Sequence, residues 1–292
     1  MRFRRSELLL DFFFLYMAAA AFAIGVPPGT RSLIVTLNVA LAGWSCLFAW
    51  AHPGRGFHLL DRVRDWWPLA GLLVALRETS WLSLVRTPGE VESTLIQWDR
   101  AVLADSGLKL LLDAGTPVVP GALELAYLLA AVLPVVMVAL FYAAGERDRL
   151  DDAWSIVLLA VLSVFAIWPW MPMEPPRLVF PGELLPPQAW PRQLTLAVVN
   201  YAGGRTGAFP SARVALAFAV PFALLRLLKG RLAVGLAGLA LAFVVALAAV
   251  YCRYHYAADV VAGFVVACVA GIAGLVLTRA VKSPWEGREE MF

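Results

Sequence analysis

Charged residues are scarce in this chain of 292 residues. They make up 15% of the sequence, whereas hydrophobic residues make up 61%. A typical soluble chain is about 25% charged and about 45–50% apolar when glycine is counted and tyrosine is not; counted in that way, this chain is about 66% apolar. A soluble fold with this composition would have too few polar groups to cover its surface. The scarcity of charge therefore excludes an ordinary soluble domain, and the mean hydropathy of +0.75 indicates an integral membrane protein.

Cysteines and basic runs are scarce as well. The three cysteines lie in or beside apolar runs, at Cys46, Cys252 and Cys268, and they indicate neither a disulfide framework nor a metal cluster. The net charge is only +3, and without a long basic run the sequence excludes a nucleic-acid partner. The glycines match no nucleotide-binding fingerprint. No internal repeat or pair of matched broken helices favours a transporter.

Long apolar runs, by contrast, are abundant. A helix needs about 20 residues to cross the hydrocarbon core, and eight segments approach that length: 9–26, 31–50, 66–85, 117–144, 153–170, 209–227, 232–250 and 257–278. The sequence predicts an all-α polytopic membrane helix bundle of about eight spans. The first run also resembles a signal peptide, but Asp11 interrupts it and a second run follows at once, which favours a retained helix.

Two charges interrupt the third run, where Arg77 and Glu78 stand side by side. Charges at membrane depth usually face a bundle interior or a wet cavity. The alternative is that this stretch lies partly in the interface, and both interpretations stay open. Glu124, inside the fourth run, is a hypothetical partner for Arg77.

The positive charges predict the orientation. With the N-terminus inside, most arginines and lysines fall on the inner loops, as the positive-inside rule requires. Both termini are then cytoplasmic. Three polar clusters, around 174–177, 205–213 and 253–259, fall on the outer face, and their arginines would bind an anion there. We expect residues 88–111 to form an outer interfacial segment that covers this site.

One cluster, Y-C-R-Y-H-Y-A-A-D-V-V-A-G at 251–263, carries a histidine and an aspartate four residues apart, His255 and Asp259. In a helix they would share one face. The aspartate would fix one imidazole nitrogen and leave the other as a nucleophile. The alternative is a helix-capping ion pair at the membrane interface.

A second cluster, G-G-R-T-G-A-F-P-S-A-R at 203–213, places glycines and a proline before a helix start, with Ser211 in the first turn. Such an end can seat a phosphate, and Arg205 and Arg213 would supply bidentate donors. The alternative is an ordinary junction whose charges touch lipid headgroups. In a third cluster, M-E-P-P-R-L at 173–178, two prolines hold the backbone extended beside Arg177.

The order Pro-Pro-Arg, Phe-Pro-Ser, His-Tyr-x-x-Asp-x-x-x-Gly resembles the signature of the type-2 phosphatidic acid phosphatase superfamily. The sequence looks most like the branch that contains inositol phosphorylceramide synthases, over about residues 117–275. This resemblance implies a six-helix membrane core that needs no metal or other cofactor. It also implies that His255 forms a phosphohistidine oriented by Asp259, and that the phosphate is cradled by Arg177, Ser211 and Arg253.

One residue departs from the family pattern. The pattern reads Pro-Ser-x-His, with a histidine that protonates the departing alcohol, whereas this chain has Arg213. Arginine cannot usefully give up a proton, although it can stabilise transition-state charge. Three explanations stay open: an inactive variant, a diphosphate substrate whose leaving group needs no acid, or a proton from another group such as Glu174 or water.

These observations predict a membrane lipid phosphatase or phosphotransferase that acts on a phospholipid, sphingolipid or polyprenyl phosphate. Water or an inositol- or sugar-like acceptor would enter in the second step. The alternative is a non-catalytic lipid-phosphate binder or translocator that keeps the anion pocket. We expect membrane spans and interfacial segments over residues 1–116, the catalytic core over 117–280 and a cytoplasmic tail over 281–292.

Overall fold

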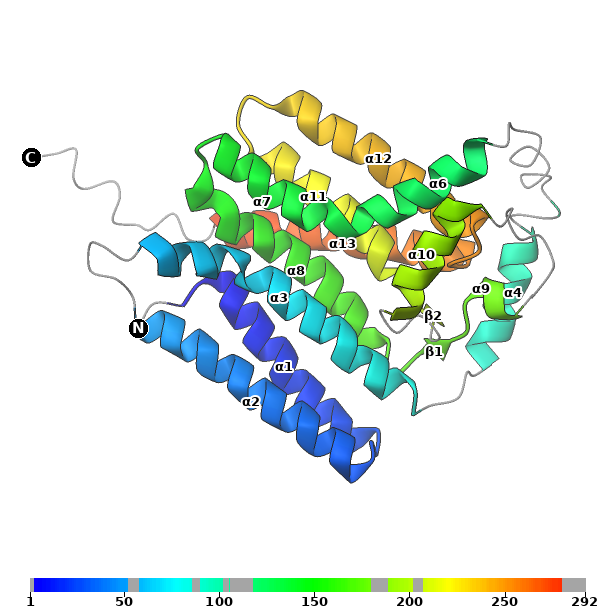
Figure 1. Cartoon of the computed structure of the whole chain (residues 1–292), viewed down its shortest axis with the longest axis horizontal. Coiled ribbons are helices and arrows are strands. Elements are labelled where there is room, and N and C mark those ends of the chain that lie inside the picture. The colour runs from blue at the N-terminus through cyan, green and yellow to red at the C-terminus, as the bar shows by residue number, and fades with distance from the viewer. Residues whose placement is uncertain are drawn as a thin grey trace, which may run out of the picture.

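A computed structural model describes residues 3–51, 58–85, 90–101, 105, 118–179, 189–201 and 207–279. Over these ranges the chain is helical except for its turns and one two-stranded ribbon (Figure 1), which confirms the predicted all-α bundle. The long helices are α1 (Arg5–Ala23), α2 (Pro28–Trp50), α3 (His58–Ser83), α8 (Leu150–Ile167), α11 (Ala212–Leu227), α12 (Leu232–Tyr251) and α13 (Ala257–Arg279). The shorter elements are α4 (Glu90–Arg100), α6 (Val118–Leu129), α7 (Leu133–Ala143), α9 (Pro176–Val179), α10 (Trp190–Tyr201), β1 (Pro172–Met173) and β2 (Gly207–Ala208).

The fourth apolar run is one span that bends in the middle. A 3-10 turn at Ala130–Val132 separates α6 from α7. Pro134 lies in the first turn of α7, and it has no N–H to continue the helical hydrogen bonding of the preceding turn.

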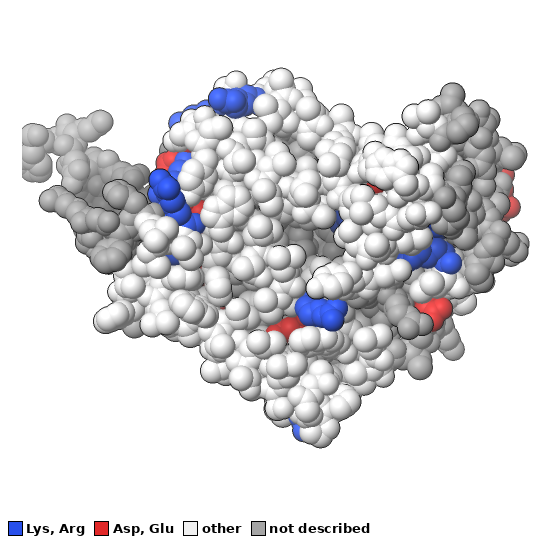
Figure 2. Space-filling view, viewed as in Figure 1, with Lys and Arg blue, Asp and Glu red and all other residues white. Residues whose placement is uncertain are grey.

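Six helical segments are long and apolar enough to cross a membrane: Arg5–Ala23, Pro28–Trp50, Val118–Ala143, Arg147–Ile167, Leu232–Tyr251 and Ala257–Gly274. The other two predicted runs also contain helices, but α3 carries charged residues along its length and α11 has only 16 residues. The face shown in Figure 2 is largely free of charged residues. Phe12, Val39 and Trp50 are among the large apolar side chains exposed on the helices, as expected of a surface that meets lipid.

The centre of the bundle is α8, which contacts α1 and α3 on one side and α11 and α13 on the other (Figure 1). Gly263 lets α13 approach α11 closely, because a Cβ there would lie 2.5 Å from the Ser211 carbonyl oxygen. This contact places the start of α11 against the start of α13.

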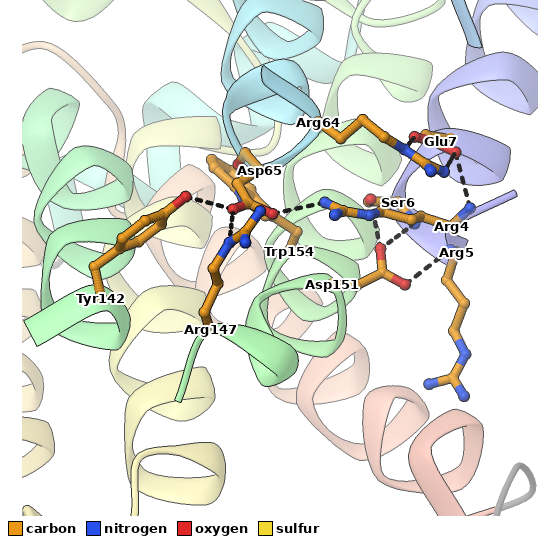
Figure 3. Close-up of polar contacts among 10 residues, drawn as sticks. All are labelled: Arg4, Arg5, Ser6, Glu7, Arg64, Asp65, Tyr142, Arg147, Asp151 and Trp154. Atoms are coloured by element: carbon orange, nitrogen blue, oxygen red, sulfur yellow. Dashed lines mark hydrogen bonds and ion pairs between the residues drawn. The ribbon is translucent and has the colours of Figure 1, made fainter. Parts of the chain in front are cut away.

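At the opposite end of the bundle, a polar network joins the N-terminal helices to the rest of the chain (Figure 3). The Asp65 carboxylate of α3 accepts hydrogen bonds from Arg4 at 2.8 Å, from Arg147 and from Tyr142. Asp151 of α8 accepts from the backbone N–H groups of the first two residues of α1, at 3.0 and 3.1 Å. The network therefore fixes α1 and α3 against α7 and α8. The predicted domain boundary after residue 116 stays a prediction, and the tail at 281–292 lies outside the described residues.

Candidate phosphate site

The two-stranded ribbon brings two of the polar clusters together. Pro172 pairs with Ala208 and Met173 with Gly207 in antiparallel register. The chain continues from β1 into the Pro-Pro-Arg cluster and from β2 into α11. The backbone N–H of Arg177 then donates to the Arg253 carbonyl oxygen at 3.1 Å. All three clusters thus meet at one end of the bundle (Figure 1).

His255 and Asp259 lie in contact, with Nδ1 3.3 Å from Oδ2, and both side chains are buried. The contact is not made along a helix face as expected, because α13 begins only at Ala257. Asp259 lies in the first turn and also accepts the Tyr256 backbone N–H at 3.0 Å. Capping of α13 therefore fixes the carboxylate that faces the imidazole.

Ser211 is the N-cap of α11, and its hydroxyl accepts the Val214 N–H at 3.4 Å. Its own backbone N–H donates to the Asp259 carbonyl oxygen at 3.0 Å. The side chain is fully buried. Ser211 therefore ties α11 to the turn that carries His255.

A pair of stacked tyrosines forms a platform for two arginines. The rings of Tyr127 and Tyr254 lie 4.4 Å apart at an angle of 7°. The Arg213 guanidinium lies 4.2 Å from the centre of the Tyr127 ring, and Arg177 lies 5.3 Å from that of Tyr254. Cation–π attraction favours both positions. Arg213 also donates to the Tyr127 carbonyl oxygen at 3.4 Å.

Arg192 is a buried site residue that sequence reasoning missed. It extends from α10, is 2% exposed and pairs with Glu124 at 2.8 Å. The Tyr254 hydroxyl donates to the other Glu124 oxygen, also at 2.8 Å. The hypothetical pair of Glu124 with Arg77 is wrong, because Arg77 is exposed and donates to the Tyr201 carbonyl oxygen instead. The only sequence signal for Arg192 was Glu124 itself, a glutamate within an apolar run, where a carboxyl group is stable only beside a cation or in its protonated form.

The positive charges are close enough to influence one another. Burial lowers the pKa of Arg177, and the positive charges of Arg192 and Arg213 act in the same direction. The two tyrosines act in the opposite direction. An incoming anion would therefore be attracted by Arg177 and Arg213 at this end of the bundle, whereas Glu124 balances the charge of Arg192.

Arg253 is paired with a carboxylate from α4. Its guanidinium lies 2.8 Å from Asp99, which also accepts the Ala257 N–H at the start of α13 at 3.2 Å. Arg253 adopts a φ of 62°, a left-handed conformation that is uncommon for a residue with a side chain. Burial raises the pKa of Asp99, while Arg253 and the Ala257 N–H oppose that shift. Leu95 packs on Met173 and Tyr256, so α4 lies against the segments that carry Arg177 and His255. The predicted cover over residues 88–111 falls partly outside the described residues.

Comparison with known proteins identifies the family. The model of the PAP2 superfamily matches residues 93–273, which is more than half of the chain. The chain belongs to the PAP2 superfamily. No curated protein and no solved structure matches it. PAP2 membership supports a phosphatase or phosphotransferase activity on lipid phosphates in the membrane.

Within the PAP2 match, the structure brings five of the expected site residues to one end of the bundle near His255: Asp259, Arg213, Arg177, Ser211 and Arg253. Arg205 lies outside the described residues. Glu174, the alternative proton donor, is exposed on the segment after β1. Over the described ranges, no group of three His, Cys, Asp or Glu residues is arranged to hold a metal ion.

Proposed function

We propose that this PAP2 protein transfers the phosphoryl group of a membrane lipid through a phosphohistidine at His255. The observation that carries the proposal is the contact between His255 Nδ1 and the Asp259 carboxylate. An N–H on Nδ1 donates to Asp259 and leaves the lone pair on Nε2. Nε2 then attacks phosphorus, the P–N bond forms, and the bond from phosphorus to the leaving oxygen breaks.

The second step releases the phosphoryl group from the histidine. A water molecule or an acceptor alcohol attacks phosphorus, the P–N bond breaks with its electron pair going to Nε2, and the proton of the attacking hydroxyl passes to a phosphate oxygen or to water. The sequence resembles the branch that contains inositol phosphorylceramide synthases, which favours transfer to an inositol-like acceptor. Water and an alcohol use the same first step, and the experiment below distinguishes them.

Stabilisation of negative charge by arginine is the main contribution that the site would make to catalysis. Arg177 and Arg213 lie over the tyrosine pair, and Arg192 lies 5.9 Å from the centre of the Tyr254 ring, paired with Glu124. Phosphoryl transfer develops charge on the equatorial and leaving oxygens, and fixed cations stabilise that charge. We assign phosphate binding to Arg177 and Ser211, and to Arg253 when a substrate phosphate displaces Asp99.

Arg213 favours a substrate with a phosphate leaving group. The guanidinium cannot protonate an alkoxide, but it can neutralise a departing phosphate, which needs no acid. Its two contacts with Tyr127 and the intact His255–Asp259 contact support a working site rather than a decayed one. We therefore propose a lipid diphosphate as substrate, and a non-catalytic binder of lipid phosphate is the competing function.

The site would face the extracytoplasmic side, with both termini in the cytoplasm. The end of the bundle that carries α1 and the Arg147–Arg149 turn is rich in arginine, and the positive-inside rule assigns such an end to the cytoplasm. The helix α8 begins at this arginine-rich end and crosses the bundle to β1 and the Pro-Pro-Arg cluster, so the site lies at the opposite end.

The test is a panel of lipid monophosphates and diphosphates given to the purified chain, with phosphate release and transfer to inositol measured in parallel. We expect release from diphosphates, no activity for His255→Ala, and slower diphosphate turnover for Arg213→His. Activity restricted to monophosphates, or gained only in Arg213→His, would reject the diphosphate assignment. Binding without turnover of any lipid by the unmodified chain would favour the non-catalytic alternative.

A further inference from the structure

Three glutamates in the described part of the chain are almost completely excluded from solvent, and one of them has no cation. Glu7 makes two hydrogen bonds with Arg64, at 2.7 and 2.8 Å (Figure 3), and Glu124 pairs with Arg192. Glu78 of α3 is 0% exposed, and it has no cationic partner among the described residues. Neither of its carboxyl oxygens makes a hydrogen bond of normal length and angle there, and the side chain beside them is the neutral amide of Asn38.

The surroundings of Glu78 are polar but uncharged. Asn38 of α2 lies beside it. The amide nitrogen of Asn38 donates to the Phe14 carbonyl oxygen of α1 at 3.0 Å, while its oxygen and the Thr79 hydroxyl have no partner among the described residues. All three N-terminal helices therefore contribute polar groups to one buried layer.

A second polar layer lies about two turns away along α2. Ser45 follows Asn38 by seven residues on the same helix face and lies beside Asp11 of α1. One Asp11 oxygen and the Ser45 hydroxyl are buried without a hydrogen-bond partner among the described residues. Asp11, Asn38, Ser45 and Glu78 form what we call the polar seam of the N-terminal unit.

No cation within the described ranges faces this seam at Glu78. The main helices packed on α3 are α1, α2, α7 and α8. Their charged residues are Arg5, Glu7, Asp11, Arg31, Asp151 and Asp152. Arg5 pairs with Asp152, and Arg31 lies over the Phe22 ring at 4.9 Å. Arg77, the neighbour of Glu78 in sequence, is exposed and directed to Tyr201.

An ionised carboxylate is expensive where neither water nor a counter-ion solvates it, and such a group binds a proton instead. We infer that Glu78 is a proton-binding site, a neutral carboxylic acid inside the N-terminal unit. Loss of the proton would leave a bare charge between α1, α2 and α3, so the packing of these helices is linked to proton binding. The site lies outside residues 93–273 and does not depend on the proposed phosphoryl transfer.

The test is labelling of the purified full chain with dicyclohexylcarbodiimide, which modifies protonated carboxyl groups in apolar surroundings. Peptide mass spectrometry should find the adduct on Glu78, in a yield that falls as pH rises. Glu7 and Glu124 are equally buried but paired with arginine, and they should stay unlabelled. Glu78→Gln should remove the adduct and leave the melting temperature unchanged, whereas the matched Glu124→Gln should lower it.

An infrared spectrum gives a second readout that does not depend on access of the reagent. The unmodified chain should show a protonated-carboxyl band that is absent from Glu78→Gln. Absence of both the adduct and the band would overturn the proposal. Labelling suppressed by sodium or potassium ions at constant ionic strength would also overturn it, because the occupant would then be a metal cation. Equal labelling of all three glutamates would contradict the proposal, because it would show that pairing with arginine does not keep Glu7 and Glu124 ionised.

Discussion

The ion pair of Glu124 and Arg192 holds the tyrosine pair of the site in place. Both side chains are 2% exposed, and Glu124 also holds the Tyr254 hydroxyl. Tyr254 stacks on Tyr127, which lies under Arg213. A buried pair of this kind contributes little net stability when complete, but removal of one partner leaves an uncompensated charge.

We predict that Glu124→Gln destabilises the protein by about 3 kcal/mol, since it leaves Arg192 buried without an anion. Thermal unfolding in detergent measures this change. The double variant Glu124→Gln/Arg192→Met should recover part of the loss, as coupled neighbours do. Additive effects of the two single variants would show that the pair is not coupled.

In the proposed reaction, Arg213 determines the pH dependence that we expect. A guanidinium keeps its charge over the accessible range, so we expect no decline in rate at high pH from loss of a general acid. Arg213→His should add such a decline, because a histidine loses its proton near about pH 6.5. The measurement is the pH profile of kcat/KM for a lipid diphosphate, in the unmodified chain and in Arg213→His. Identical profiles would contradict the proposed role of Arg213 at the leaving group.

At the scale of elements, the close contact of α13 with α11 positions the histidine turn. A methyl group on Gly263 would lie 2.5 Å from the Ser211 carbonyl oxygen, which is backbone and cannot rotate away. The two helix starts would have to separate, and Ser211 would move from the Asp259 carbonyl oxygen that now accepts its N–H.

Gly263→Ala should therefore destabilise the protein by about 1–3 kcal/mol and reduce turnover. Gly271→Ala in the same helix is the matched control, because its methyl group would meet Phe222 at an ordinary 3.5 Å. Thermal unfolding and phosphate release should distinguish the two variants. Equal behaviour would show that the contact at Gly263 is not tight.

The helix α4 is held to the site by Asp99, through Arg253 and the start of α13. Asp99→Asn removes the charge of this anchor, so we predict faster hydrogen exchange over residues 93–99. Thr94→Ser on the exposed side of α4 is the control and should leave exchange unchanged. Unaltered exchange in Asp99→Asn would mean that packing of Leu95 alone holds α4.

The helices could be predicted from hydropathy because each apolar run is long and turn residues separate most of them. The bend before Pro134 could not be predicted, because the sequence alone does not distinguish a proline in the first turn of a helix from a proline inside one. Arg192 was missed because α10 lies within a segment, 171–208, that is rich in proline and glycine and was read as a long loop. The spacing of His255 and Asp259 correctly predicted that the two side chains are in contact. The reason was different, because the contact depends on the capping of α13 and not on a shared helix face.

At the scale of the whole molecule, the two ends of the bundle have different chemistry. One end carries the network around Asp65 (Figure 3), and the other carries the site. Orientation can be tested in intact cells in a variant without Cys46, Cys252 and Cys268. Glu174→Cys should react with a membrane-impermeant thiol reagent, and Asp148→Cys, also at an exposed position, should react only after permeabilisation. The reverse pattern would contradict the orientation.

The central claim is that His255 is the nucleophile. The most direct measurement is rapid quenching of the purified chain with a lipid diphosphate labelled on its terminal phosphate, followed by mass mapping of acid-labile phosphopeptides. The account predicts a phosphoryl group on His255, lost in His255→Ala and depleted in Asp259→Asn. Phosphate release by the unmodified chain with no phosphohistidine during turnover, or with His255→Ala still active, would contradict it.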